Sequence, residues 1–183
     1  AGSVREHPSG RAVQAGALSV LAMKAFDVVG LGNTLVDVVV EIPEELLQSL
    51  HLEKGESHIM EEQRAKEILL QVQHLPSEKI PGGSSANALK GVALLGGKVL
   101  LCGKVGEDEF GAFYIREMEK RGVVSRICRH HTGTGHALTM ISPDAERTFS
   151  VFLGAAVHLL PTDIAEQDIG ESKVIHLEGY QLE

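Results

Sequence analysis

The run Pro81-Gly82-Gly83-Ser84-Ser85-Ala86-Asn87, at the start of an apolar helical pattern, is the part of this sequence best suited to hold a small polar ligand. Glycine has no Cβ, so two adjacent glycines let the backbone N–H groups approach a ligand closely. Asn87 adds a donor and an acceptor near the start of a helix, where polar ligands often bind. The run therefore predicts a floor for a hydroxyl-rich molecule. The alternative is a structural Gly-Gly turn in which serine caps the next helix.

Asp37 is an acidic residue inside the otherwise Val-rich segment Leu35–Glu41. Burying a carboxylate is costly unless donors hydrogen-bond to it. The vicinal hydroxyls of a sugar are suitable donors, so Asp37 is a candidate ligand acceptor. The alternative places Asp37 on the solvent face of an edge strand.

Two further charged residues stand at places where ligands bind. Glu178 ends an apolar strand pattern, and ligands bind at the carboxyl ends of strands in open α/β sheets. Arg147 lies beside a turn, where it either binds phosphate, closes over a substrate, or stays an exposed hairpin residue.

Other site types are not supported by the spacing of residues. Gly30-x-Gly32 follows a strand, but Leu35 occupies the third glycine position of a dinucleotide fingerprint and no helix is expected next. The nine histidines, including His130, His131 and His136, do not place three ligands on one helical face. No Ser-His-Asp, Cys-His or P-loop pattern is present.

Composition indicates a soluble globular chain with an aliphatic core, since 43% of its 183 residues are hydrophobic and only 4% are aromatic. A formal charge of −8 argues against nucleic acid or an anionic membrane as the main partner. No run of residues is long enough to span a bilayer. Cys102 and Cys128 lack metal-ligand spacing and predict reduced, buried thiols in a cytoplasmic protein.

The order of elements predicts an α/β sheet with helices on both faces. Residues 1–22 predict an N-terminal extension, either disordered or an expression remnant, with a targeting peptide as the alternative. A hairpin is expected around Pro143-Asp144-Ala145-Glu146. Strands are expected at Phe26–Leu31, Leu35–Glu41, Lys98–Val105, His136–Ile141, Arg147–Leu153 and Val174–Leu177, and helices after Pro43, at Glu61–Val72, Ser84–Leu95 and Phe110–Arg121, and from Pro161.

Taken together, these segments resemble the PfkB-type, ribokinase-like family of carbohydrate and nucleoside kinases, most closely its adenosine-kinase-like branch. The resemblance runs from about Ala25 to the last residue. Ser85 and Leu89 depart from the small residue types that the family signature usually has there. The motifs that carry the resemblance are Gly32-Asn33-Thr34-Leu35-Val36-Asp37, Gly82-Gly83-Ser84-Ser85-Ala86-Asn87, Gly96, Lys104-Val105-Gly106-Glu107-Asp108-Glu109-Phe110-Gly111, Glu146-Arg147-Thr148-Phe149 with Leu153-Gly154-Ala155, and Leu177-Glu178-Gly179-Tyr180.

The resemblance implies a three-layer αβα sheet with a small β lid, truncated at the C-terminus, in which residues 23–183 form the N-terminal part of a kinase domain. The lid would use residues of about 35–60 and 123–153, and two lids would pair in a homodimer. It implies phosphoryl transfer from ATP, with Mg²⁺, to a sugar or nucleoside. The implied substrate-binding residues are Asn33, Asp37, Gly82, Gly83, Asn87, Arg147 and Glu178.

No catalytic residue is expected within these 183 residues. The family's Gly-Ala-Gly-Asp segment, which supplies the anion hole and the catalytic base, does not occur before Glu183. The chain alone is therefore expected to be inactive. Two other hypotheses stay open at this point: a kinase-derived binding module without catalysis, and an unrelated α/β domain that uses the Gly-Gly turn only structurally.

Overall fold

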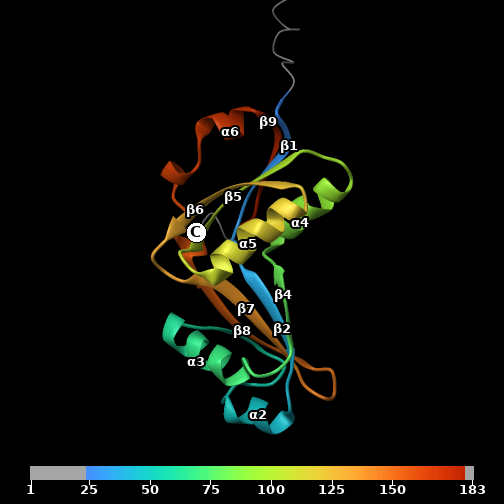
Figure 1. The fold of residues 1–183 in the computed structure, drawn as a ribbon, viewed down its shortest axis with the longest axis vertical. Coiled ribbons are helices and arrows are strands. Elements are labelled where there is room, and N and C mark those ends of the chain that lie inside the picture. Colours follow the sequence, from blue (N-terminus) through green and yellow to red (C-terminus); the bar gives the residue numbers. More distant parts are fainter. Residues whose placement is uncertain (1–23, 180–183) are drawn as a thin grey trace, which may run out of the picture.

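A computed structural model describes residues 24–179, which form two sheets arranged end to end along the long axis of the molecule (Figure 1). The main sheet has the strand order β6-β5-β1-β9, and all of its neighbouring strands are parallel. Its strands are β1 (Phe26–Leu31), β5 (Val99–Gly106), β6 (Val123–His130) and β9 (Ser172–Leu177). Every residue of β5 is buried, as expected for a central parallel strand, and this includes Lys104, whose Nζ pairs with Asp163 over 2.6 Å.

The two faces of the main sheet are covered by different segments. Helices α4 (Ser84–Leu94) and α5 (Glu109–Lys120) pack on the face that includes Val99 and Leu101. Leu100 and Cys102 face the other way, where Ile164 and Ile169 pack against them. The covering segment on that side consists of the 3-10 turns Ala155–His158 and Pro161–Asp163 and the short helix α6 (Glu166–Gly170).

The second sheet, called the lid sheet below, has the strand order β3-β8-β7-β2-β4. Residues along β2 alternate between buried and half-buried, the pattern of a strand with one face packed and one face open. The predicted hairpin is confirmed as the antiparallel pair β7 and β8. The strands are β2 (Val36–Glu41), β3 (Ser57–Ile59), β4 (Ser77–Pro81), β7 (Thr134–Ile141) and β8 (Arg147–Gly154).

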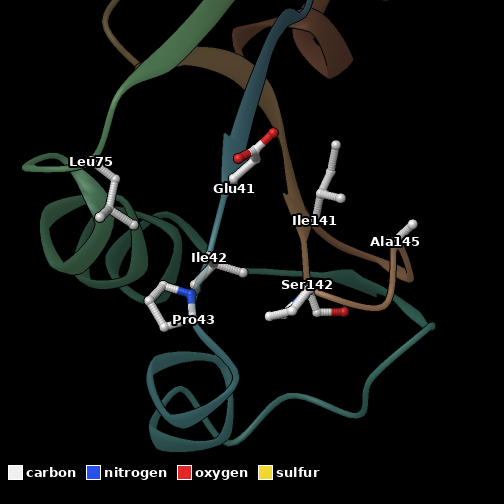
Figure 2. Close-up of a pocket in the computed structure, with 8 residues that line it drawn as sticks. Glu41, Ile42, Pro43, Leu75, Ile141, Ser142 and Ala145 are labelled. Carbon is white, nitrogen blue, oxygen red and sulfur yellow. The ribbon is translucent and has the colours of Figure 1, made fainter.

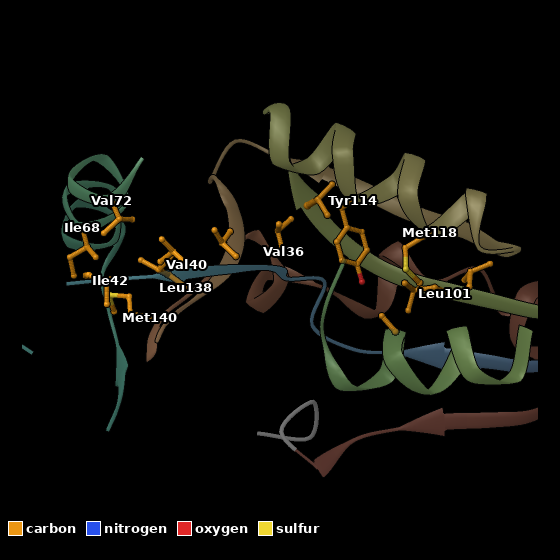
Figure 3. Packing of buried hydrophobic residues seen from close by; sticks show 14 of the residues in the cluster. Val36, Val40, Ile42, Ile68, Val72, Leu101, Tyr114, Met118, Leu138 and Met140 are labelled. Atoms are coloured by element: carbon orange, nitrogen blue, oxygen red, sulfur yellow. The ribbon is translucent and has the colours of Figure 1, made fainter. Parts of the chain in front are cut away.

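One apolar core joins the two sheets (Figure 3). At the lid end, Ile68 and Val72 of α3 (Glu62–Val72) pack against Val40, beside α2 (Glu44–Ser49). At the other end, Tyr114 and Met118 of α5 are fully buried. The lid is therefore fixed to the main sheet through a continuous set of aliphatic contacts.

Several expectations need correction. Val123–His130 is not part of the lid, because it pairs with β5 along its whole length as an edge strand of the main sheet. Ser77–Pro81 is a lid strand that the sequence pattern did not reveal, since its side chains are mostly exposed. Pro161 begins only a 3-10 turn, and Cys128 is half-buried rather than buried. The proposed extension at 1–22 lies outside the described residues.

Strand β9 forms the other edge of the main sheet among the described residues. Its apolar side chains are unusually open, with Val174 54% and Ile175 52% exposed. Apolar residues on an unpaired strand edge favour association with another strand.

Candidate functional site

Asp37 and the Gly-Gly run meet where the lid sheet joins the main sheet. Asp37 lies in β2 opposite Ile80 of β4, and its carboxylate rests directly on the backbone of Gly82. A Cβ placed at Gly82 would stand 2.2 Å from Oδ2 and 2.3 Å from Oδ1 of Asp37. Only glycine leaves room for the carboxylate in this position. Asp37 and Gly82 are 45 residues apart in sequence, and they can touch because Gly82 has no side chain.

The loop between β1 and β2 holds the other side of the run. The Gly82 N–H donates to the Leu35 carbonyl over 2.7 Å. Gly83 has a φ of +89°, and a Cβ there would stand 2.0 Å from the backbone oxygen of Asn33. Asn33, Asp37, Gly82 and Gly83 therefore form one contiguous group. Both glycines are required, one for close approach and one for its left-handed backbone.

The Asp37 carboxylate can accept hydrogen bonds that residues 24–179 do not supply. Among residues 24–179, no hydrogen bond to its oxygens is found, although the residue is half-buried. Burial raises the pKa of Asp37, and the nearby Lys90 charge opposes this only in part. The same burial lowers the pKa of Lys90, whose Nζ donates to the Pro81 carbonyl over 2.6 Å. A ligand hydroxyl is a donor that this carboxylate lacks.

The first turn of α4 brings Glu178 to the same region. The hydroxyl of Ser84 donates to Oε2 of Glu178, which follows the carboxyl end of β9. Glu178 Oε1 lies 3.6 Å from Nε2 of His176. Asn87 is exposed one turn into α4, and its N–H donates to the Gly83 carbonyl over 2.9 Å. Glu178 and Asn87 thus border the run on its helical side.

Arg147 is not brought to this group. It is the first residue of β8 and pairs with Ile141, which pairs with Glu41 at the distal end of β2. Asp37 lies at the other end of that strand, in register with Ala137. The register of the lid sheet therefore separates Arg147 from the run, and its side chain is exposed.

The distal end of the lid sheet carries a separate open pocket of about 630 Å³ (Figure 2). Glu41, Ile42 and Pro43 line one side of it, and Ile141, Ser142 and Ala145 line the other. It is a different feature from the Asp37 site, since none of the residues named for that site lines it.

Two residues that hold the run were missed from the sequence. Tyr114 of α5 donates a hydrogen bond to the Gly82 carbonyl over 3.0 Å, and Lys90 of α4 holds the neighbouring Pro81 carbonyl. Lys90 follows Asn87 by three residues, so a helical reading of the run could have included it. No local signal marks Tyr114, because its contact joins residues 32 positions apart.

Among residues 24–179, no group of three or more His, Cys, Asp or Glu side chains is arranged to hold a metal ion. Within the same range, no helix is long and apolar enough to cross a membrane.

The fold is the N-terminal part of a ribokinase-like fold. It has a parallel sheet with an attached lid, and an acceptor carboxylate rests on a Gly-Gly run between the two. The family model described as pfkB family carbohydrate kinase matches residues 59–183. The chain belongs to this family. Membership removes the hypothesis of an unrelated α/β domain.

Curated relatives in this family are sugar kinases. The chain is 33% identical over 109 residues to fructokinase-2 of Zea mays, an alignment that covers 57% of this chain and 32% of the relative. It is 37% identical over 109 residues to 5-dehydro-2-deoxygluconokinase of Clostridium perfringens, with the same shares of each chain covered. The chain thus spans about a third of the length of the curated relatives it matches.

Solved structures agree on the fold. A probable sugar kinase protein from Rhizobium etli superposes with a TM-score of 0.73 at 29% identity, covering 87% of this chain and 48% of that one. Adenosine kinase from Sinorhizobium meliloti superposes with a TM-score of 0.70 at 30% identity, covering 85% and 48%. Sugar kinases and adenosine kinases are therefore both similar to this chain.

Proposed function

We propose that the complete protein transfers the γ-phosphoryl group of ATP to a hydroxyl of a sugar or nucleoside, and that this chain supplies the floor for the sugar. The observation that carries the proposal is the Asp37 carboxylate, half-buried against Gly82 and without a hydrogen-bond donor among residues 24–179. Adjacent sugar hydroxyls donate to such a carboxylate, and Asn33, Gly83, Asn87 and Glu178 border the place where the ring would lie.

The chemistry gives this floor a positioning role. In phosphoryl transfer, the acceptor oxygen forms a bond to the γ-phosphorus while the bond from phosphorus to the ADP oxygen breaks, and the hydroxyl proton leaves. Holding the acceptor in line removes much of the entropic barrier. Asp37 binds hydroxyls that do not react and so fixes the one that does. The substrate class is a sugar or a nucleoside, because sugar kinases at 33% and 37% identity and an adenosine kinase at 30% identity are all similar to this chain.

ATP and Mg²⁺ belong to the proposal because the family resemblance implies them. No metal step is assigned to residues 24–179, which hold no suitable group of ligands. The absence of the Gly-Ala-Gly-Asp segment from the sequence supports the prediction that these 183 residues alone do not catalyse phosphoryl transfer. A cytoplasmic location likewise stays a prediction.

A homodimer through the lid strands also stays a prediction. The structure limits the surfaces of the lid sheet that could form it. Helix α3 lies over the lid face that carries Val38 and Val40. Pairing would therefore use the edge strands β3 or β4 or the opposite face.

The test is a binding titration of the 183-residue chain with adenosine, ribose and fructose, in which NMR spectra report the binding. Losing hydrogen bonds to a charged group costs about 1.5–3 kcal/mol, so Asp37→Asn should weaken binding by roughly 10- to 150-fold. The matched control is Asp27→Asn, which removes a carboxylate near the start of β1, where the Lys98 backbone N–H and the Lys173 Nζ donate to it. Asp27→Asn should bind as the wild-type chain does.

Equal binding by the wild-type chain and Asp37→Asn would refute the role of Asp37. Absence of binding by all three ligands would favour a structural turn. Binding by a complete protein that shows no release of ADP would favour the non-catalytic module.

A further inference from the structure

Tyr114 is a buried polar residue that the proposed site does not use directly. It belongs to α5, its side chain is fully excluded from solvent, and its hydroxyl donates to the Gly82 carbonyl over 3.0 Å. Figure 3 shows the ring projecting from α5, with its oxygen on the side of the turn between β4 and α4. A side chain from the main domain thus reaches the backbone of the Gly-Gly run.

Packing of the core does not require the hydroxyl of Tyr114. The ring lies in the apolar core with Ala86, Leu89 and Met118, where phenylalanine would fill nearly the same volume. A hydroxyl buried without a partner costs free energy, and a hydrogen bond of good geometry offsets that cost. Its acceptor is the backbone of Gly82, the residue on which Asp37 rests.

The hydrogen bond determines how the Gly82–Gly83 peptide is oriented. Gly82 is held at both ends, by its N–H to the Leu35 carbonyl over 2.7 Å and by its carbonyl to Tyr114. In a trans peptide the C=O and the next N–H point in opposite directions. With the carbonyl facing α5, the Gly83 N–H is directed away from α5, and no acceptor for it is found in residues 24–179.

The orientation leaves a donor, the Gly83 N–H, one residue along the chain from Gly82, on which the Asp37 carboxylate rests. The Gly83 N–H follows the residue that supports the Asp37 carboxylate, and a sugar hydroxyl can accept from the first while it donates to the second. The Pro81 carbonyl is held separately by Lys90 over 2.6 Å, so α4 and α5 each fix one peptide of the run.

We propose that Tyr114 is a positioning residue for the sugar floor: its hydroxyl fixes the Gly82–Gly83 peptide so that the Gly83 N–H and the Asp37 carboxylate face the same ligand hydroxyl. The proposal rests on the proposed function of Asp37. It predicts that removing one oxygen atom in the core changes ligand binding without changing the fold.

The experiment compares Tyr114→Phe with Met118→Leu in the 183-residue chain. Met118 is fully buried on the same helix one turn later, so Met118→Leu controls for altered packing of α5. Three readouts are taken by NMR: the Gly82 carbonyl carbon and Gly83 amide shifts, the pH titration of the Asp37 carboxyl, and ligand affinity.

We expect Tyr114→Phe to shift the Gly82 and Gly83 signals, to change the Asp37 titration, and to weaken binding about 5- to 10-fold. Met118→Leu should leave all three readouts as in the wild-type chain. Unchanged Gly82, Gly83 and Asp37 signals in folded Tyr114→Phe would overturn the proposal, as would equal changes in both variants.

Asp37→Asn separates this proposal from the proposed function. If Asp37→Asn loses binding and Tyr114→Phe does not, only the role of Tyr114 is wrong. If Asp37→Asn binds normally, the function assigned to Asp37 is wrong, and the Gly82 and Gly83 signals then test the hydrogen bond alone.

A second variant covers the case in which Tyr114→Phe does not fold. The sequence has two tyrosines, so Tyr180→Phe with 3-fluorotyrosine labels Tyr114 alone. Fluorination makes the phenol more acidic and keeps its donor, so the Gly82 carbonyl carbon should shift in the direction opposite to that expected for loss of the bond. An unchanged Gly82 signal would overturn the proposal.

Discussion

Gly82→Ala tests the site at its most constrained contact. The new Cβ would stand 2.2 Å from Oδ2 of Asp37, whereas ordinary contact begins at 3.4 Å. The carboxylate or the backbone must therefore move by about 1.2 Å. Lys90 and Tyr114 hold the backbone of the run, so we expect the Asp37 carboxylate to move.

The magnitude follows from what that movement removes. A carboxylate displaced by about 1 Å loses the short contacts that make charged hydrogen bonds worth about 1.5–3 kcal/mol each. Ligand affinity should fall roughly 10- to 150-fold. Overpacking should cost about 1–3 kcal/mol of unfolding free energy if the backbone yields instead.

The assay pairs a ligand titration with a pH titration of the Asp37 carboxyl by NMR. Displacement from its half-buried position should lower the pKa of Asp37 toward the ordinary value, because burial is what raises it. The matched control is Gly91→Ala within α4, where a Cβ meets no heavy atom within 4 Å. It should stabilise the chain by about 0.5–1 kcal/mol and leave binding unchanged.

Two results would refute this reasoning. One is a Gly82→Ala chain whose Asp37 titrates, and whose ligand binds, as in the wild-type chain. The other is a Gly91→Ala chain that loses affinity to the same degree, since the effect would then not depend on contact with Asp37.

Three further predictions concern stability and activity. Burial raises the pKa of Asp37 in the folded chain, so the stability that its protonated form contributes is present below about pH 3.8 and is lost as pH rises. Asp37→Asn should therefore raise Tm at pH 7 but not at pH 3, as measured by thermal unfolding. Burial would raise the pKa of Asp108, but hydrogen bonds from Thr134 and Gly111 hold it below its usual range. Asp108→Ala should cost about 1–2 kcal/mol at pH 7 in urea unfolding, and the difference from wild type should shrink as pH falls below about 3.8. The 183-residue chain should release no ADP with adenosine or sugars in a coupled assay, and turnover abolished by Asp37→Ala would contradict this.

The elements of the fold could be predicted largely from local sequence. Strand β1 has the bounds expected from its apolar run, and α4 and α5 begin and end within about a residue of expectation. These signals are local because hydrophobic periodicity, and glycines after helix ends, act on the residues beside them. The motif order also indicated the family, and the family match confirms it.

Strand partners could not be predicted in the same way. Val123–His130 and Thr134–Ile141 are neighbours in sequence, yet the first pairs in the main sheet and the second in the lid sheet. Nothing within either segment encodes its partner, because backbone hydrogen bonds in a sheet are the same for any pair of strands. Strand β4 has mostly exposed side chains and showed no pattern at all.

The features of the candidate site can also be separated into those that sequence predicts and those that only the tertiary structure decides. Sequence alone predicted that a carboxylate at Asp37 and a Gly-Gly run with Asn87 are suited to bind hydroxyls, because those chemistries belong to single residues. Tertiary structure decided that Asp37 rests on Gly82, that the lid register carries Arg147 away, and that Tyr114 holds the run. Such contacts join residues that are distant in the chain, and they depend on packing between elements, which no local pattern records.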